Sequence, residues 1–175
     1  MKKIDLNKLR DKAYKTACEH GLHDQELSNE HCLCLVISEL MKAVEADRKR
    51  KYFKGKIMFE RDFNLYSALV EENVRYRNAF EKHIKDTVGD KLADTVIRLL
   101  DLAGLRNLNL NRFALVNVVS KKKTFTENIH SIVKDITNYK YTLEELVNYA
   151  ITQVFVLSDI LDIDLLWHIE HKMKY

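Results

Sequence analysis

The chain of 175 residues contains no proline and only four glycines. Proline breaks helices most strongly and glycine comes next, so the commonest interruptions of helical structure are almost missing. A hydrophobic content of 46% is enough to build a core in a chain of this length. We therefore predict one all-α domain over residues 1–175, a helical bundle of five to seven helices.

The net charge is small, and cysteines and long apolar runs are few. A net charge of +3 gives by itself no reason to expect a nucleic-acid partner. The three cysteines form no disulfide framework, and the N-terminal "MKKIDLNKLRDKAYK" lacks the apolar segment of a signal peptide, so a cytoplasmic location is expected. The longest apolar run, "LCLVI", is too short to cross a membrane.

Apolar periodicity predicts helices at about residues 6–20, 28–50, 64–84, 88–103, 127–137, 143–160 and 162–175. Gly21 and Gly104 are expected to close the first and the fourth. The expected N-caps are Ser28 or Asn29, Thr87, Thr124 or Thr126, Thr142 with Glu145 as a capping box, and Asp162 or Asp164. The inward stripe of residues 64–84 is expected to be Leu65, Leu69, Tyr76 and Phe80.

Three segments are interpreted as structural rather than functional. Cys32–Ile37 is apolar on every side and should be the most buried stretch, and His31, Cys32 and Cys34 fit no zinc spacing. Residues 48–56, "RKRKYFKGK", carry six basic side chains and are expected to form a solvated loop, with a phosphate-attracting patch as the alternative. The basic run at residues 120–123 is interpreted in the same way, and the role of residues 50–85 is open.

Two helices each carry an acid and a lysine three residues apart, Glu39 with Lys42 and Lys91 with Asp94. Residues at this spacing share a helix face, and two antiparallel helices would bring the four groups to one level of a bundle. Facing carboxylates are how bundles hold hard divalent cations such as Mg²⁺. Spacing alone, however, favours ordinary ion pairs.

The stretches "ISELMKAVEADRK" and "DKLADTVIRLLDLAGL" resemble the paired signature of the MazG-like, all-α nucleoside triphosphate pyrophosphohydrolases, E-x-x-E on one helix and E-x-x-D on another. The C-terminal "DIDLLWHIEHKMKY" resembles the family's last segment. The resemblance covers roughly residues 28–51, 83–106 and 160–175. It implies hydrolysis between the α- and β-phosphates of a nucleoside triphosphate, with four acids holding Mg²⁺.

This sequence departs from the family pattern at two of the four ligand positions, where Lys42 and Lys91 replace glutamates. A charged lysine has only donors and cannot ligate a cation, which puts Mg²⁺ binding in doubt. Glu39 and Asp94 remain as candidate catalytic residues. A displaced metal site would comprise Glu39, Glu45, Asp94 and Asp101, and Arg98 could pair with Asp94 or Asp101.

The resemblance also implies that the terminal helix closes over the nucleotide through Trp167, His168, Lys172 and Tyr175, with packing as the alternative. It further implies a homo-oligomer, a dimer or tetramer. Three functions stay open: a Mg²⁺-dependent nucleotide pyrophosphohydrolase, a non-hydrolytic nucleotide-binding or assembly protein, and a basic accessory protein that contacts nucleic acid through residues 48–56 and 121–123. Nucleic acid is the least expected partner.

Overall fold

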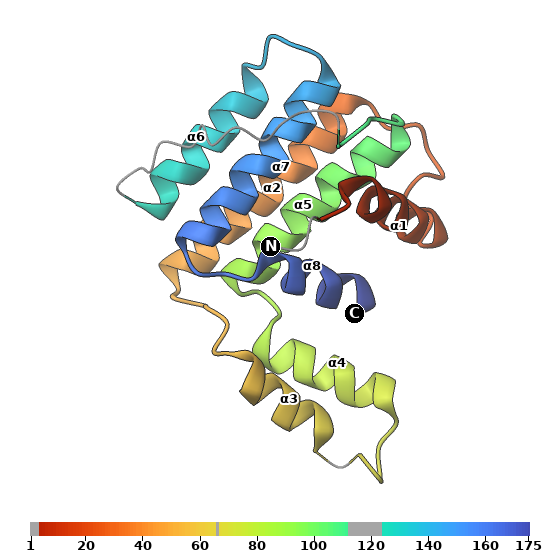
Figure 1. The fold of residues 1–175 in the computed structure, drawn as a ribbon, viewed down its shortest axis with the longest axis vertical. Helices are drawn as coiled ribbons and strands as arrows, with labels where there is room; N and C mark the ends of the chain where they lie inside the picture. The colour runs from red at the N-terminus through yellow and green to blue at the C-terminus, as the bar shows by residue number, and fades with distance from the viewer. Residues whose placement is uncertain (1–3, 66, 112–123) are drawn as a thin grey trace.

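The computed structural model describes residues 4–65, 67–111 and 124–175, and these ranges contain eight helices and no strand (Figure 1). The helices are α1 (Leu6–Glu19), α2 (Asn29–Arg48), α3 (Lys56–Asn64), α4 (Glu72–His83), α5 (Val88–Leu105), α6 (Phe125–Thr137), α7 (Leu143–Ile160) and α8 (Leu165–Lys174). The predicted all-α class is confirmed. The basic run at residues 121–123 lies outside the described residues.

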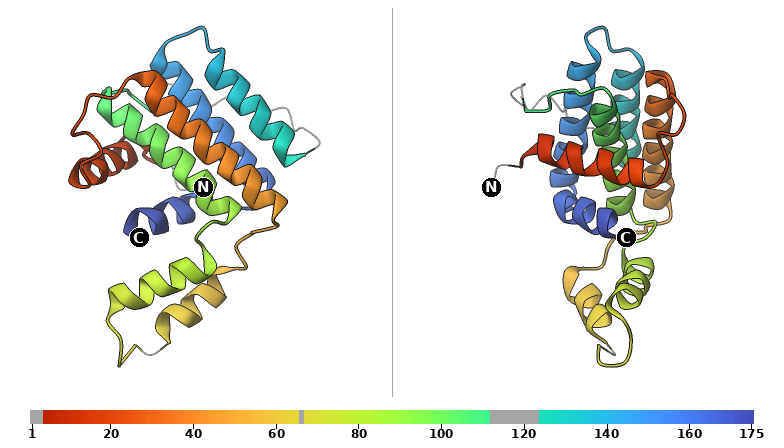
Figure 2. Two further views of the ribbon diagram at one scale, coloured as in Figure 1. Left: turned by 180° about the vertical axis from the view of Figure 1, so that it is seen from behind. Right: turned by 90° about the vertical axis from the view of Figure 1, so that its right-hand side faces the viewer.

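Four helices, α2, α5, α6 and α7, lie side by side and form the main bundle (Figures 1 and 2). The central helix is α5, which packs against α1, α2, α7 and α8, and it runs in the opposite direction to α2. Its predicted apolar stripe is fully buried, at Leu92, Val96, Leu99, Leu100 and Ala103.

A hairpin of α3 and α4 projects from one end of the bundle (Figure 1). It has a small core of its own, against which Trp167 of α8 packs; its members are Phe59, Tyr76, Ala79, Phe80 and Ile84. The prediction of one helix over residues 64–84 was wrong, because α3 ends at Asn64 and α4 begins at Glu72. Leu65 and Leu69, expected inside, are 51% and 81% exposed, since they lie in the connection rather than on a packed helix face.

Most predicted helix starts are confirmed, because the side chain of the cap residue accepts a hydrogen bond from a backbone N–H in the first turn. The caps are Ser28, Thr87, Thr124, Thr142 and Asp164, and Thr124 and Thr142 form capping boxes with Glu127 and Glu145. The helix α6 begins at Phe125, two residues earlier than predicted. Gly21 follows α1 with a φ of 69°, as its predicted role requires.

Two expectations about burial and helix ends are corrected. The segment Cys32–Ile37 is not the most buried one, because only Cys32 and Val36 are buried while Cys34 is exposed. When a helical segment is apolar on every side, its sequence does not indicate which of its faces pack against other helices. Gly104 does not end α5, which continues to Leu105.

The basic loop between α2 and α3 is mostly exposed, as expected. It is tied to the bundle at two points: the carbonyl of Lys51 accepts a hydrogen bond from the Val88 amide, and Phe53 stacks on Trp167. No single helix in the described ranges has the length and apolar composition of a membrane span; α7 and α8 pass such a test only as a pair, with a bend of 112° between them.

Replacing Gly104 with alanine tests how α1 is seated on α5. In an open helix Gly→Ala stabilises by about 1 kcal/mol. Here a Cβ at residue 104 would overlap the side chain of Tyr14 on α1. We expect Gly104→Ala to lower the free energy of unfolding by about 1–3 kcal/mol in urea titrations. Ser38→Ala on the exposed face of α2 is the control and should stay within about 0.5 kcal/mol of the parent; equal stability of Gly104→Ala would contradict the close packing of α1.

Candidate functional site

The two motif helices are neighbours, as predicted, because α2 packs along α5. Glu39 of α2 lies close enough to Asp94 of α5 for its charge to act on the pKa of that carboxyl. Both side chains belong to the inward part of their helices, with Glu39 buried and Asp94 half-buried. The structure therefore brings the motif carboxylates to one place between α2 and α5.

The pair on α2 is formed but lies partly in solvent. The Lys42 ammonium donates to Oε1 of Glu39 over 2.9 Å. The Lys42 side chain is 54% exposed and the Glu39 side chain only 9%. The second oxygen, Oε2, is buried and has no hydrogen-bond partner among the described residues. Glu39 is thus only half satisfied by its lysine.

The lysine on α5 is enclosed by carboxylates. The ammonium of Lys91 lies 3.0 Å from Asp86, 3.4 Å from Asp90 and 3.4 Å from Asp94, and its side chain is 13% exposed. Burial alone lowers the pKa of Lys91, but the charges of Asp90, Asp94 and Asp86 and the hydrogen bond to Asp86 outweigh burial and raise it. Lys91 is therefore firmly protonated.

A third lysine comes from the C-terminal helix. The Lys172 ammonium of α8 lies 2.9 Å from Oδ1 of Asp90 and 3.2 Å from Oδ2 of Asp94. Asp90 has no solvent exposure, and its Oδ2 also accepts the Asp86 backbone N–H over 2.8 Å. The resemblance suggested Lys172 as a phosphate contact and gave no role to Asp90. Asp90 lies four residues before Asp94 and therefore on the same helix face, and this spacing was the signal in the sequence that could have identified it.

These residues form what we call the lysine–carboxylate cluster: Glu39, Lys42, Asp86, Asp90, Lys91, Asp94 and Lys172. Four carboxylates share three ammonium groups. Burial raises the pKa of Asp94; the ammonium groups of Lys172 and Lys91 oppose the shift, while Asp90 and Glu39 add to it. The cluster is thus neutralised mainly from within.

His168 lies against the N-terminal turn of α5. It is 3% exposed, and an added Cβ at Gly89 would stand 2.6 Å from its Nε2, so α8 approaches α5 closely at this point. Burial lowers the pKa of His168 to about 4, so the ring is neutral near pH 7. A buried, neutral ring is suited to packing and offers no positive charge to a phosphate.

The other two residues expected at the nucleotide lie in different surroundings. Trp167 stacks on Phe53 and on His171, with ring centroids 4.8 and 3.7 Å apart, and so belongs to the packing of the hairpin. Tyr175 stacks on Phe80 at 4.2 Å. Tyr175 also lines a cavity of about 470 Å³ between α4 and the end of α8, together with Glu72, Asn73, Tyr76, Arg77 and Lys174.

Two acids of the displaced metal site, Glu45 and Asp101, do not join Glu39 and Asp94. Asp101 pairs with Nε2 of His23 over 2.7 Å, and exposed Glu45 pairs with Lys49 and Arg48. Seven residues separate Asp101 from Asp94, about 10 Å along the helix, which is too far to share one ion. The described ranges contain no group of three potential ligands that could hold a metal ion.

The expected partner of Asp101 also differs. The described ion pairs of Asp94 and Asp101 are made by lysines and by His23, and none involves Arg98. The possible pairing of Arg98 with one of these acids is therefore not among the described ion pairs. Sequence spacing placed Arg98 between the two acids, but His23 comes from the connection between α1 and α2 and could not be assigned to Asp101 from local spacing.

The arrangement does not fit Mg²⁺. The ion needs several oxygen ligands in near-octahedral geometry. Here Asp90 and Asp94 already face Lys91 and Lys172, and within the described ranges Oε2 of Glu39 is the one fully buried oxygen of the cluster that lacks a hydrogen-bond partner.

Comparison with known proteins found no matching family model, no matching curated protein and no matching solved structure. The family resemblance of the two motifs therefore stays a prediction.

Lys172→Met tests whether α8 is held by charge. The change leaves Asp90 buried with one ammonium fewer, and breaking such a pair is costly. We expect a loss of about 2 kcal/mol in the free energy of unfolding near pH 7, less than for a fully buried pair because Lys91 remains in place. Lys174→Met, which removes the exposed pair with Glu72, is the control and should cost less than about 1 kcal/mol.

The same variant has a predicted pH dependence. A raised pKa means that folded Asp94 binds protons more readily than the unfolded chain does, so lowering the pH relieves the unpaired charge in the folded state. The difference between Lys172→Met and the parent should shrink between about pH 7 and pH 4. A difference that stays constant over this range would show that Lys172 acts through packing alone.

Proposed function

We propose that this chain is a nucleotide-binding relative of the MazG-like nucleoside triphosphate pyrophosphohydrolases that hydrolyses its ligand very weakly or not at all. The observation that carries the proposal is Lys91. It stands where the family motif has a metal-binding glutamate, and it contacts three carboxylates. Internal ammonium groups thus supply the positive charge that the family takes from a metal ion.

Electrostatics supports weak hydrolysis. A cation entering between Glu39 and Asp94 would face Lys91 and Lys172 at close range, in addition to Lys42. At about 4 Å and an effective dielectric near 20, each pair of like unit charges costs about 4 kcal/mol, and a divalent ion doubles this. Binding Mg²⁺ would therefore require the lysines to leave carboxylates that they neutralise.

The cavity beside Tyr175 supports nucleotide binding. Its volume of about 470 Å³ falls within the range of about 300–1,000 Å³ typical of small-molecule sites. Its lining offers the aromatic rings of Tyr76 and Tyr175 and the cationic groups of Arg77 and Lys174. The Lys172 ammonium lies 5.9 Å from the Tyr175 ring, so the cavity adjoins the lysine–carboxylate cluster. Rings for a base and cations for phosphates are present without a metal ion.

The unmodified protein should bind nucleoside triphosphates without Mg²⁺ and release almost no pyrophosphate. Titration calorimetry against a dNTP panel, with and without Mg²⁺, measures binding, and a pyrophosphate assay measures turnover. Arg77→Gln should weaken binding about fivefold or more, because it removes a charged partner of the phosphates. Arg61→Gln on α3, outside the cavity lining, is the control. Robust Mg²⁺-dependent turnover by the unmodified protein would refute the proposal.

The double variant Lys42→Glu with Lys91→Glu should recreate a four-carboxylate site with Glu39 and Asp94. Without divalent ions it should melt below the parent, because the new carboxylates repel the old ones. Mg²⁺ or Mn²⁺ should raise its melting temperature by mass action and give Mg²⁺-dependent pyrophosphate release. Lys12→Glu with Lys15→Glu on exposed α1 makes the same charge change and should show neither effect. If neither Mg²⁺ nor Mn²⁺ raised the melting temperature of the double variant, the motif positions would not form a metal site.

A further inference from the structure

Three tyrosines gather where α6 turns into α7. Tyr139 and Tyr141 lie in the connection between the two helices, and Tyr149 lies on the second turn of α7. The Tyr139 ring centroid is 5.5 Å from that of Tyr141, at 65°, and 6.2 Å from that of Tyr149, at 31°. Aromatic rings at these separations and tilts are in contact with one another, and the cluster offers ring faces and ring edges to an aromatic ligand.

The rings border a pocket of about 230 Å³, which is also lined by Lys134, Asp135, Asn138 and Lys140. This volume is below the range of about 300–1,000 Å³ usual for whole small ligands. It suits one planar ring system whose substituents extend into solvent. Tyr141 is 75% exposed, so packing within the protein does not account for its place at the rim.

The charges at the rim are mixed but favour an anion. Lys134 and Lys140 are exposed and make no ion pair in the described part of the chain. Asp135 is held by the Nε2 of buried Gln153, which donates to its Oδ2 over 2.6 Å. The pocket therefore combines aromatic faces, a fixed carboxylate that accepts hydrogen bonds, and two exposed ammonium groups.

We propose that this pocket binds a nucleobase whose attached phosphate is held by Lys134 and Lys140, in a free nucleotide or in a single strand of nucleic acid. The base stacks on the tyrosine rings that border the pocket, its N–H groups face Asp135, and the phosphate lies outside the pocket. Purines are preferred over pyrimidines because they offer more stacking area.

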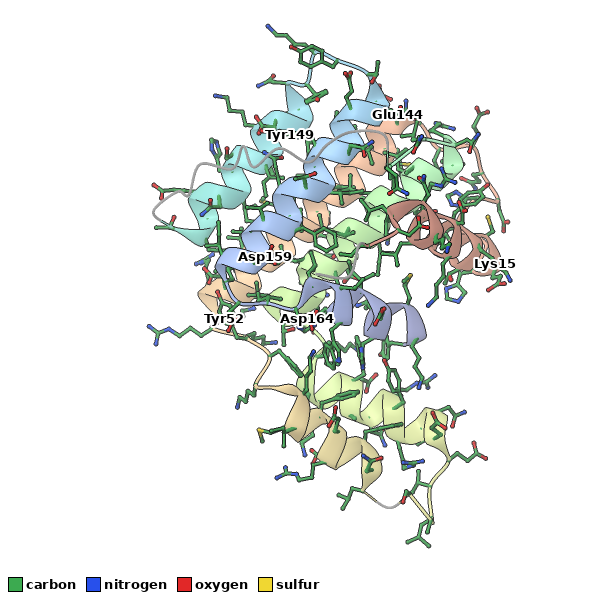
Figure 3. The ribbon with its side chains drawn as sticks, in the orientation of Figure 1. Lys15, Tyr52, Glu144, Tyr149, Asp159 and Asp164 are labelled. Atoms are coloured by element: carbon green, nitrogen blue, oxygen red, sulfur yellow. The ribbon has the colours of Figure 1, made fainter. Side chains whose placement is uncertain are left out.

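The proposed site is distinct from the cavity beside Tyr175. Tyr149 lies near the end of the bundle formed by the α6–α7 connection, whereas Asp164 and Tyr52 lie toward the end that carries the hairpin (Figure 3). No residue lines both pockets. Success or failure of this proposal is thus separable from that of the proposed function.

The test uses the full chain with ¹³C-labelled tyrosine rings, observed by NMR during titration with AMP, GMP, UMP and ribose 5-phosphate. Ring signals of Tyr139, Tyr141 and Tyr149 should shift saturably with AMP and GMP, less with UMP, and not with ribose 5-phosphate. Shifts confined to Tyr76 and Tyr175 would place the nucleotide at the other cavity and overturn the proposal.

Variants locate the binding. Tyr141→Ala should weaken AMP binding about fivefold or more, since removing one stacking ring commonly costs this much or more. Tyr52→Ala, another exposed tyrosine, should leave these ring shifts unchanged. Lys134→Gln with Lys140→Gln should weaken binding and flatten its salt dependence, whereas Lys12→Gln with Lys15→Gln should not. Equal affinity in Tyr141→Ala and the parent would refute the site.

Comparing ligands of different length distinguishes a free nucleotide from a single strand of nucleic acid as the source of the base. A short single-stranded oligonucleotide that binds more tightly than the mononucleotide, with a steeper salt dependence, assigns the pocket to nucleic acid. Equal affinities assign it to free nucleotides. Absence of saturable binding by either ligand would overturn the proposal.

Discussion

The structure around the motifs depends on one carboxylate that water does not reach. Asp90 has no exposed surface, and a buried charge costs several kcal/mol unless it is paired and hydrogen-bonded. Its partners come from three places: Lys91 one residue further along α5, the Asp86 amide before the helix, and Lys172 on α8. Satisfying Asp90 therefore fixes the entry into α5 and the position of the C-terminal helix together.

The two lysines at the motif positions are not equivalent. Lys42 is half in solvent and contacts one oxygen of Glu39, which leaves the other oxygen without a partner in the described ranges. Lys91 is enclosed and contacts three carboxylates. Exposed pairs contribute little to stability, whereas enclosed ones are costly to break. Lys91, with Lys172 behind it, therefore decides whether the site can accept an external cation.

Local signals in the sequence predicted much of the fold, because they report local physics. Caps such as Thr87 and Thr142 are fixed by hydrogen bonds over three residues, and the spacing of Glu39 and Asp94 placed each acid on an inward face. The break between α3 and α4 has neither glycine nor proline within it to mark it, and its leucines suggested a stripe. Predicting that break requires knowing that the hairpin has only a small core of its own.

The partners of the site residues could not be predicted, because they come from distant parts of the chain. Lys172 reaches Asp90 across 82 positions and His23 reaches Asp101 across 78. No pattern within one helix specifies which side chain of another helix will face it. The sequence thus identified Glu39 and Asp94 but missed the fully buried Asp90. Tertiary packing determined which cations these acids meet.

Helix α8 and the residue after it contact the hairpin, α5, the lysine–carboxylate cluster and the larger cavity. Trp167 packs on the core of the hairpin, His168 seats on Gly89 of α5, Lys172 enters the cluster, and Tyr175 borders the larger cavity. Because three of these residues lie on one short helix of ten residues and Tyr175 directly follows it, α8 cannot shift at one contact without disturbing the others. A ligand in the cavity beside Tyr175 would therefore act on the Lys172 ion pairs, and the charge state of the cluster would act in turn on how tightly that cavity holds its ligand.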